Sequence, residues 1–288
     1  MMSTFVIVTD SSSDLSAELL TQYDVISLPL TVTMEGRDPV PNDEVDTKEF
    51  YEFLRSKKGA KTSAVAMEVF KDAFRPYLEE GKDLLYLGFS SGLSNTFNAG
   101  RLAVQELCEE FPDRKIFAVD TLCASLGQGL IVYYATQKRA EGADVETVRD
   151  YVEGLKPNLV HLFTVNDLFF LHRGGRVSAM TAIAGSALGI KPIMHVDNEG
   201  HLIKLGTKRG RKGSLDELCA MMESNAINPA EQTVFISHGD CLEDAQYLAD
   251  RVREKMGVKS FVIDYVGPVI GAHSGPGTVA LFYLGKER

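Results

Sequence analysis

Residues 5–15 have the sequence Phe-Val-Ile-Val-Thr-Asp-Ser-Ser-Ser-Asp-Leu, an apolar run that ends in hydroxyl and carboxyl side chains. The apolar part is typical of a buried strand, and the polar part is typical of a turn that leads into a helix. The same order recurs at 84–96, Leu-Leu-Tyr-Leu-Gly-Phe-Ser-Ser-Gly-Leu-Ser-Asn-Thr. Ligands bind at the carboxyl ends of strands in open α/β sheets, so both turns are candidate binding loops.

Strands and helices are expected to alternate through the first half of the chain. Further predicted strands are 84–88 and 116–119, and the predicted helices are 67–79, 95–110 and 125–141. Such alternation predicts a parallel sheet. The polar, proline-containing stretch at 34–48 does not fit this pattern, and we expect it to cross the surface as a lid or an edge.

A break at Lys156-Pro157-Asn158, after a predicted helix at 144–154, separates the two halves of the chain. Turn-forming residues at 197–200 predict a hairpin and therefore antiparallel pairing in the second half. We predict an α/β fold with domains at 1–156 and 157–288, the first with a parallel sheet and the second with a mixed sheet. In the second domain the predicted strands are 159–164, 191–196, 201–206, 232–238, 260–266 and 278–284, with a helix at 241–256.

Composition excludes several classes of protein. The formal net charge of −10 disfavours nucleic acids and anionic membrane surfaces as partners, because the summed field repels polyanions. The four cysteines, Cys108, Cys123, Cys219 and Cys241, form no Cys-x-x-Cys pair, which argues against a zinc site or a disulfide framework. No apolar run approaches bilayer length, so we expect a cytoplasmic protein without stable membrane insertion.

The two serine-rich turns suit a small anionic group. Hydroxyls and free N–H groups at a helix N-terminus stabilise an anion such as a carboxylate. Helix capping explains a single residue such as Ser13 or Asp14 equally well, and it also explains Lys61-Thr62-Ser63 before the predicted helix at 67–79.

Glycines and prolines surround one histidine at 267–277, near the end of the chain. Glycine has the most backbone entropy to lose on folding, so a loop of this composition is costly to build for structure alone. A lone histidine is more often structural than functional. The loop nevertheless favours a role for His273, which is expected to hydrogen-bond an anion directly or through Ser274.

Residues 88–92, Gly-Phe-Ser-Ser-Gly, match the G-x-S-x-G motif of a nucleophile elbow, which makes a serine hydrolase the competing hypothesis. Ser90, with Asp240 or Asp264 and then His273, has the chain order of that triad. No oxyanion motif of the His-Gly-Gly-Gly kind precedes it, and short glycine motifs arise by chance. A third hypothesis is a regulatory module that binds a small anion and lacks an elongated apolar cavity.

Two arginine-containing stretches are candidates for contact with a partner. Arg173 and Arg176 belong to Arg-Gly-Gly-Arg, and Arg209 belongs to the basic stretch at 208–212. Solvated loops explain both stretches as well. The segment at 179–190 is apolar and consists largely of small side chains, which is consistent with room for an acyl tail or with close helix packing.

Together these residues resemble the DegV family, whose characterised members serve as the fatty-acid-binding subunit of bacterial fatty acid kinase. The resemblance rests on residues 9–15, 90–94, 173–176 and 267–277, in the family's order and approximate spacing, and spans nearly the whole chain. It implies two domains, the first a three-layer α/β/α domain, with the fatty acid in a tunnel between them.

The resemblance also implies the site and its use. Thr62 and Ser94 would hold the carboxylate of a long-chain fatty acid such as hexadecanoate, with Ser63, His273, Ser274 and Ser11 nearby. The chain would use no cofactor or metal and would catalyse nothing alone. A separate kinase subunit would bind ATP and form an acyl phosphate for phospholipid synthesis.

Two features of the sequence bear on this expectation. No G-x-x-x-x-G-K-[ST] phosphate loop occurs, which agrees with an ATP site on another chain. Ala64-Val65-Ala66 stands where family members commonly have Gln-Pro-Ser, and Asn95 replaces a common glycine. We therefore expect the preferred chain length to differ from that of other members.

Overall fold

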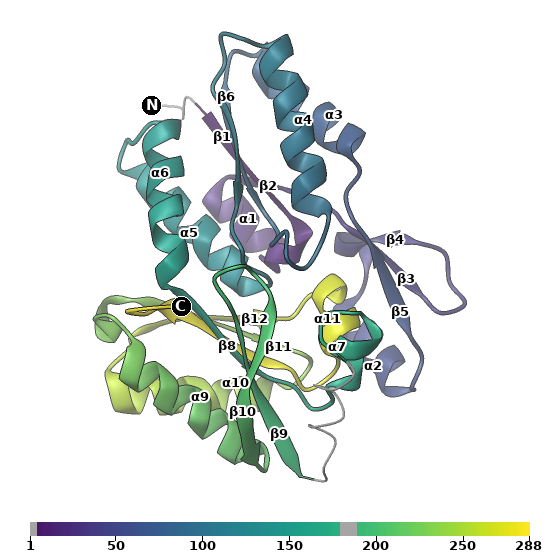
Figure 1. Ribbon diagram of the computed structural model, residues 1–288, viewed down its shortest axis with the longest axis vertical. Coiled ribbons are helices and arrows are strands. Elements are labelled where there is room, and N and C mark those ends of the chain that lie inside the picture. The colour runs from purple at the N-terminus through teal and green to yellow at the C-terminus, as the bar shows by residue number, and fades with distance from the viewer. Residues whose placement is uncertain (1–4, 179–188) are drawn as a thin grey trace.

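The computed structural model describes residues 5–178 and 189–288, which form two sheets stacked along the long axis of the molecule (Figure 1). The first sheet is parallel, in the order β2-β1-β6-β7. Its strands are β1 (Phe5–Asp10), β2 (Val25–Leu28), β6 (Asp83–Gly88) and β7 (Ile116–Asp120).

Helices cover both faces of this sheet. The helices α1 (Ala17–Tyr23), α5 (Leu126–Ala140) and α6 (Val145–Leu155) share one apolar core with the sheet, and α3 (Met67–Glu79) and α4 (Thr96–Glu110) share another. Neighbouring strand residues point to opposite faces, so Leu85 belongs to the first core and Tyr86 to the second. The predicted three-layer α/β/α arrangement is confirmed.

The second sheet is mixed, in the order β10-β9-β8-β13-β11-β12. Only the β11–β12 pair is parallel among its pairings. The helices α9 (Arg211–Asn225) and α10 (Leu242–Met256) cover one face. Its strands are β8 (Leu159–Thr164), β9 (Ile190–Val196), β10 (Leu202–Arg209), β11 (Thr233–His238), β12 (Ser260–Tyr265) and β13 (Val279–Leu284).

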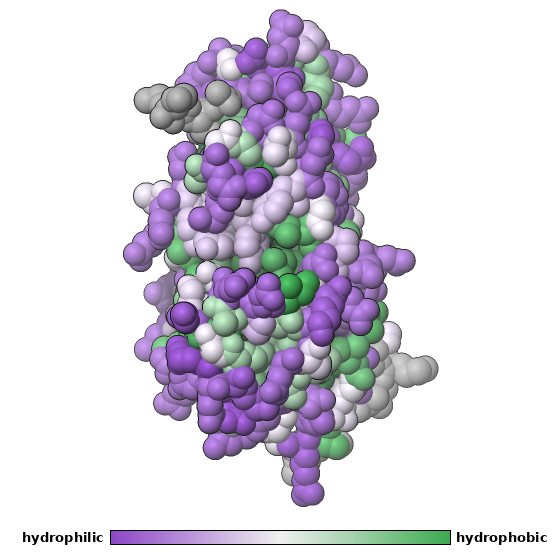
Figure 2. All heavy atoms as spheres, turned by 90° about the vertical axis from the view of Figure 1, so that its left-hand side faces the viewer, coloured by the Kyte–Doolittle hydropathy of each residue, from purple (hydrophilic) through white to green (hydrophobic). Residues whose placement is uncertain are grey.

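The other face of the mixed sheet turns toward the first half of the chain. Phe163, Phe235, Ala280 and Phe282 on this face belong to the same apolar core as helix α5. The two sheets are therefore joined by a shared hydrophobic core. In Figure 2 hydrophilic residues cover most of the side that is shown, and apolar residues reach the surface at mid-height, where the two halves meet.

A third, small sheet was not predicted. It consists of β3 (Thr31–Met34), β4 (Val40–Pro41) and β5 (Ala60–Ser63), and α2 (Thr47–Arg55) belongs to the same region. The stretch at 34–48 does lie over the surface, as predicted, and contains the edge strand β4 of this sheet, whereas Lys61-Thr62-Ser63 is a strand rather than a helix cap. Strands of two to four residues are too short to show a clear sequence period.

The segment at 267–277 also differs from the predicted loop. Helix α11 (Pro268–Ser274) occupies its centre, with Pro268 in the first turn, where proline suits a helix. Gly275 and Gly277 follow with positive φ angles of 77° and 78°. Helix α11 packs against α7 (Phe169–Arg173), α2, β3 and β5, so the third sheet is bound to the second half of the chain.

Most of the other predicted elements are confirmed. The helix at 67–79 has the predicted bounds, and the hairpin at 197–200 joins antiparallel β9 and β10. Short 3-10 helices occupy Ser11–Ser13, Asn42–Glu44, Lys156–Asn158 and Pro229–Glu231. The domain boundary at 156/157 stays a prediction, and the predicted role of 179–190 falls almost entirely outside the described residues. Within 5–178 and 189–288, no helix combines the length and apolar character needed to cross a bilayer.

Asp10 links the two serine-rich turns. Its buried carboxyl group accepts hydrogen bonds from the hydroxyl of Ser12, from the hydroxyl of Tyr86 at 2.8 Å and from the backbone N–H of Phe89 at 3.0 Å. The backbone N–H of Ser12 donates a longer bond of 3.2 Å. Burial raises the pKa of Asp10 above its usual value, while these donors lower it.

We predict that Asp10→Ala lowers the free energy of unfolding by about 3 kcal/mol, because several buried donors lose their acceptor at once. Urea denaturation at neutral pH measures this change. Asp113→Ala, in an exposed turn, is the control and should change the free energy of unfolding by less than about 0.5 kcal/mol. Equal losses in the two variants would contradict the proposed linking role of Asp10.

Candidate functional site

A cavity of about 480 Å³ lies between the first and second sheets. Its volume falls within the range of small-molecule sites, about 300–1,000 Å³. The lining is mostly apolar and comes from both halves of the chain. Apolar residues that line it include Leu30, Phe89, Leu93, Phe163, Leu171, Val196, Leu202, Val266, Val269, Ile270, Ala280 and Phe282.

One wall of the cavity is the inner face of the mixed sheet. His161 and Phe163, two residues apart on β8, point to the same side of the sheet. Across the ladder they pair with Phe282 and Ala280 of β13, and Ala280 pairs in turn with Ser237 of β11. Ala280 leaves a gap between larger neighbours, so this wall is not filled by its own side chains.

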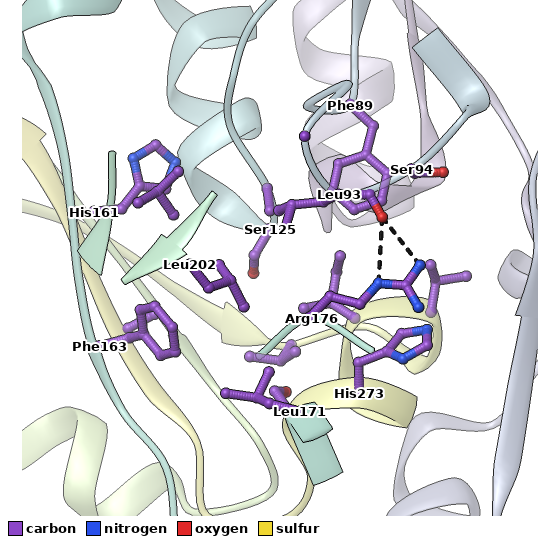
Figure 3. A pocket seen from close by; sticks show the side chains of 18 of the residues that line it. Phe89, Leu93, Ser94, Ser125, His161, Phe163, Leu171, Arg176, Leu202 and His273 are labelled. Carbon is purple, nitrogen blue, oxygen red and sulfur yellow. Dashed lines mark hydrogen bonds between the residues drawn. The ribbon is translucent and has the colours of Figure 1, made fainter. Parts of the chain in front are cut away.

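Polar residues gather on the opposite side of the cavity (Figure 3). The Thr62 hydroxyl lies 2.8 Å from Nε2 of His273, which joins β5 to α11. The Ser94 hydroxyl accepts the backbone N–H of Thr96 at 3.2 Å and so lies at the start of α4. Ser274 Oγ is buried and has no hydrogen-bond partner among the described residues. These four residues offer hydroxyl and imidazole groups to one polar ligand group.

His273 is held as a neutral imidazole. Burial, together with the nearby cations of Arg176 and Arg173, lowers its pKa to about 4. Gly174 makes this position possible, because a Cβ there would lie 2.2 Å from Nδ1 of His273. The first glycine of the Arg-Gly-Gly-Arg stretch therefore gives the histidine ring room to pack against the backbone.

Arg176 lies in the cavity wall and not on an outer surface. Its Nε and Nη2 atoms donate hydrogen bonds of 3.2 and 3.0 Å to the carbonyl of Leu93, as the dashed lines in Figure 3 show. A further bond goes to the carbonyl of Gly174. Arg176 thus ties the second serine-rich turn to the segment after α7 and brings a positive charge to the polar side of the cavity.

A second network of buried polar residues forms part of the cavity wall. Ser125 donates a hydrogen bond of 2.5 Å to Asp14 and lies 3.0 Å from the hydroxyl of Ser237. Burial raises the pKa of Asp14 to about 8, so this carboxyl group is largely protonated at neutral pH. Neither Ser125 nor Ser237 was predicted from the sequence. Ser125 has φ 55° and ψ −151°, a strained backbone conformation with no sequence signal of its own.

A second cavity, of about 630 Å³, adjoins the first. Thr62, Arg176 and His273 line both, so the polar residues lie where the two cavities meet. Arg37, Lys61 and Arg173 also line the second cavity and make its wall mainly basic, with Glu35 as the one acidic lining residue in the described part of the chain.

The predicted site residues are only partly brought together. Thr62, Ser94, His273, Ser274 and Arg176 line the first cavity, and Arg173 lines the second. Ser63, Ser11 and Arg209 line neither. Ser11 instead accepts the backbone N–H of Leu30 at 2.9 Å, and Arg209 is exposed at the end of β10.

The geometry does not assemble the hydrolase triad. Ser90 is buried and donates its hydroxyl hydrogen to the carbonyl of Gly200 at 2.9 Å, while Nε2 of His273 faces Thr62. Asp240 forms an ion pair with Arg55, and Asp264 accepts the N–H of Tyr265 at 2.7 Å. Ser90 therefore connects the turn to the β9–β10 hairpin, and the G-x-S-x-G match was a chance one.

One group of possible metal ligands exists among the described residues. Donor atoms of Asp197, Glu199 and His201 lie within 4.8 Å of one another in the β9–β10 hairpin. Two of the three side chains are exposed, and Asp197 Oδ1 already accepts the N–H groups of Glu199 and His201 at 2.9 Å each. These bonds stabilise the hairpin turn, which accounts for the presence of Asp197 without a metal ion.

We predict that His273 makes the protein less stable in acid. Because its pKa is lower in the folded chain, about 4, than the 6.5 of a free histidine, unfolding takes up a proton between these values. Stability must then fall as the pH falls. Between pH 7 and 4.5 the wild type should lose about 2 kcal/mol more free energy of unfolding than His273→Gln. Exposed His201→Gln is the control and should lose stability like the wild type. Identical losses in wild type and His273→Gln would refute the prediction.

Comparisons with known proteins agree with this architecture. A DegV domain-containing protein of Clostridium perfringens is 44% identical over 289 residues, covering 100% of this chain and 99% of that protein. A DegV lipid binding protein from Thermotoga maritima has a solved structure with 30% identity and a TM-score of 0.87, covering 99% of both chains. A DegV family protein from Thermus thermophilus, whose structure is described as showing fatty acid binding, has 30% identity and a TM-score of 0.86, covering 97% of this chain and 99% of that one.

A family model described as "Uncharacterised protein, DegV family" matches residues 4–286 of the sequence. The match spans both sheets, the third sheet and every residue that lines the two cavities. The resemblance that the serine-rich turns and the glycine-rich segments indicated is confirmed: the chain belongs to the DegV family.

Proposed function

We propose that this protein binds a long-chain fatty acid in the cavity between its two sheets. The observation that carries the proposal is that the cavity combines a large apolar lining with a cluster of polar groups, in which Ser94 and His273 lie on the same side and Thr62 contacts His273. Solved relatives that are 30% identical over nearly the whole chain are described as lipid or fatty-acid binding. An amphiphile with one small polar end matches this combination.

The energetics favour a fatty acid over a small anion. Each buried methylene contributes about 0.8 kcal/mol, so a long tail can exceed the costs of association. The carboxylate needs donors, because an unpaired buried charge is strongly unfavourable. Thr62, Ser94 and Ser274 supply hydroxyls, and Arg176 supplies a nearby positive charge that is already bound to Leu93. A small anion would leave the apolar part of the cavity unused.

We further propose that the bound carboxylate is presented to a separate ATP-binding kinase subunit. The polar residues lie between the acyl cavity and the basic second cavity, which gives a phosphoryl donor a route to the carboxylate. In the transfer, a carboxylate oxygen forms a bond to the γ-phosphorus of ATP and the bond to the β–γ bridging oxygen breaks. The products are an acyl phosphate and ADP. Basic side chains in the second cavity would stabilise the phosphate charge.

The purified protein is expected to carry its fatty acid. Organic extracts of the purified protein should contain about one fatty acid per chain, measured by mass spectrometry. The variant Thr62→Ala/Ser94→Ala should lose most of it, because the carboxylate loses two hydroxyl donors. Ser63→Ala, on the same strand but outside the cavity, is the matched control and should retain it. Absence of lipid from the wild type, both as purified and after incubation with hexadecanoate, would overturn the proposal.

Phosphorylation of the bound acid is expected to require a second protein and the basic residues of the second cavity. With ATP alone the bound acid should stay unchanged, and with a DegV-associated kinase subunit it should become an acyl phosphate, trapped as a hydroxamate. Arg173→Glu should lower this rate at least tenfold without loss of bound fatty acid, because it reverses a charge in the second cavity. Lys259→Glu, an exposed charge reversal that lines neither cavity, is the control. Equal rates for the two variants would remove the second cavity from the role proposed for it.

A further inference from the structure

His161 is a polar residue in the part of the cavity where an acyl tail would lie. It projects from β8 beside Phe163, and Figure 3 shows both on the side of the cavity away from Ser94 and His273. Its ring meets Phe282 edge-on at a centroid distance of 5.2 Å. On the helix side it packs against Gly127, where a Cβ would lie 2.1 Å from Nε2 of His161. The fold therefore leaves space for an imidazole at this point.

The hydrogen-bonding capacity of this imidazole is largely unused. His161 is 2% exposed, and neither ring nitrogen has a partner at full hydrogen-bond geometry among the described residues; a weaker interaction with the backbone of Leu159 raises its pKa by less than burial lowers it. Burial lowers its pKa well below the usual value, with Arg288 acting in the same direction, so the ring is neutral. A neutral imidazole has one donor and one acceptor nitrogen, and a buried polar group without partners costs free energy.

The other polar groups of the inner wall are satisfied. Ser125 and Ser237 are hydrogen-bonded to each other, and Ser125 also bonds Asp14. A saturated hydrocarbon tail offers nothing to His161. A hydroxyl group on the tail can donate to an acceptor nitrogen or accept from a donor nitrogen, so it can pair with whichever ring nitrogen meets the tail.

We infer that the acyl chamber accepts fatty acids that carry an oxygen function, such as a hydroxyl or keto group, along the chain, and that His161 is the residue that selects them. This inference rests on the proposed function and specifies its substrate class. The carboxylate is held at the Thr62–His273 side, and the chain oxygen is recognised at the opposite wall. An unmodified tail still binds, but it leaves the imidazole without a partner.

The test compares octadecanoate with octadecanoates that carry one hydroxyl at different positions along the chain. Dissociation constants are measured by titration calorimetry on delipidated protein. The wild type should bind at least one hydroxylated isomer about fivefold more tightly than octadecanoate, the effect of one net hydrogen bond. His161→Leu should abolish that preference while binding octadecanoate at least as well. Phe163→Leu, on the same strand and face, is the control and should retain the preference.

The outcomes separate this inference from the proposed function. If octadecanoate binds and no hydroxylated isomer is preferred by the wild type, the role of His161 is refuted and fatty-acid binding stands. The same holds if His161→Leu keeps the wild-type preference. If neither octadecanoate nor any isomer binds the wild type, the proposed function itself fails. His161→Gln, which retains a donor and an acceptor, should keep part of the preference if leucine at this position prevents folding.

Discussion

The buried carboxyl group of Asp10 is the constraint on which the site depends. A carboxyl group without water must find its donors within the protein, and Asp10 finds them in both serine-rich turns. Gln128 of α5 extends the same network, since its Oε1 lies 2.9 Å from the Ser12 hydroxyl and its amide group donates to Thr9. The ends of β1 and β6 and the start of α5 are thereby fixed relative to one another. The cavity between the two sheets lies against this fixed edge, and the mixed sheet closes it from the other side.

The main elements could be predicted because their sequence patterns are long. The strand-to-helix turns after β1 and β6 and the helix at 67–79 have clear patterns and lie as predicted. The third sheet could not be predicted, since its strands have two to four residues. The pattern at 267–277 was interpreted as a loop because glycine and proline dominate it. Instead, Pro268 begins a short helix that carries His273, and Gly275 follows its last residue.

The site was predicted only where its chemistry is visible in short motifs. The resemblance supplied Thr62 and Ser94, and the glycine-rich segment pointed to His273 and Ser274; all four line the cavity. The apolar wall could not be foreseen, because all six residues of β8 are buried and no alternation shows which face meets the cavity. The motif around Ser90 suggested a catalytic nucleophile, because a sequence does not show which group a side chain bonds. A serine in a suggestive motif can serve a purely internal bond, and only its partner, the carbonyl of Gly200, reveals this.

That bond between Ser90 and Gly200 also bears on how fast a bound molecule can leave. Gly92 packs so closely on the hairpin that a Cβ would lie 2.9 Å from the carbonyl oxygens of Glu199 and Gly200. The hairpin joins β9 to β10, the edge strand of the mixed sheet, which pairs on one side only. We expect this edge to separate from the turn before the central strands do. The rate at which a ligand leaves would then be limited by the separation of the hairpin from the turn. Two ligands of very different affinity could therefore have similar dissociation rates.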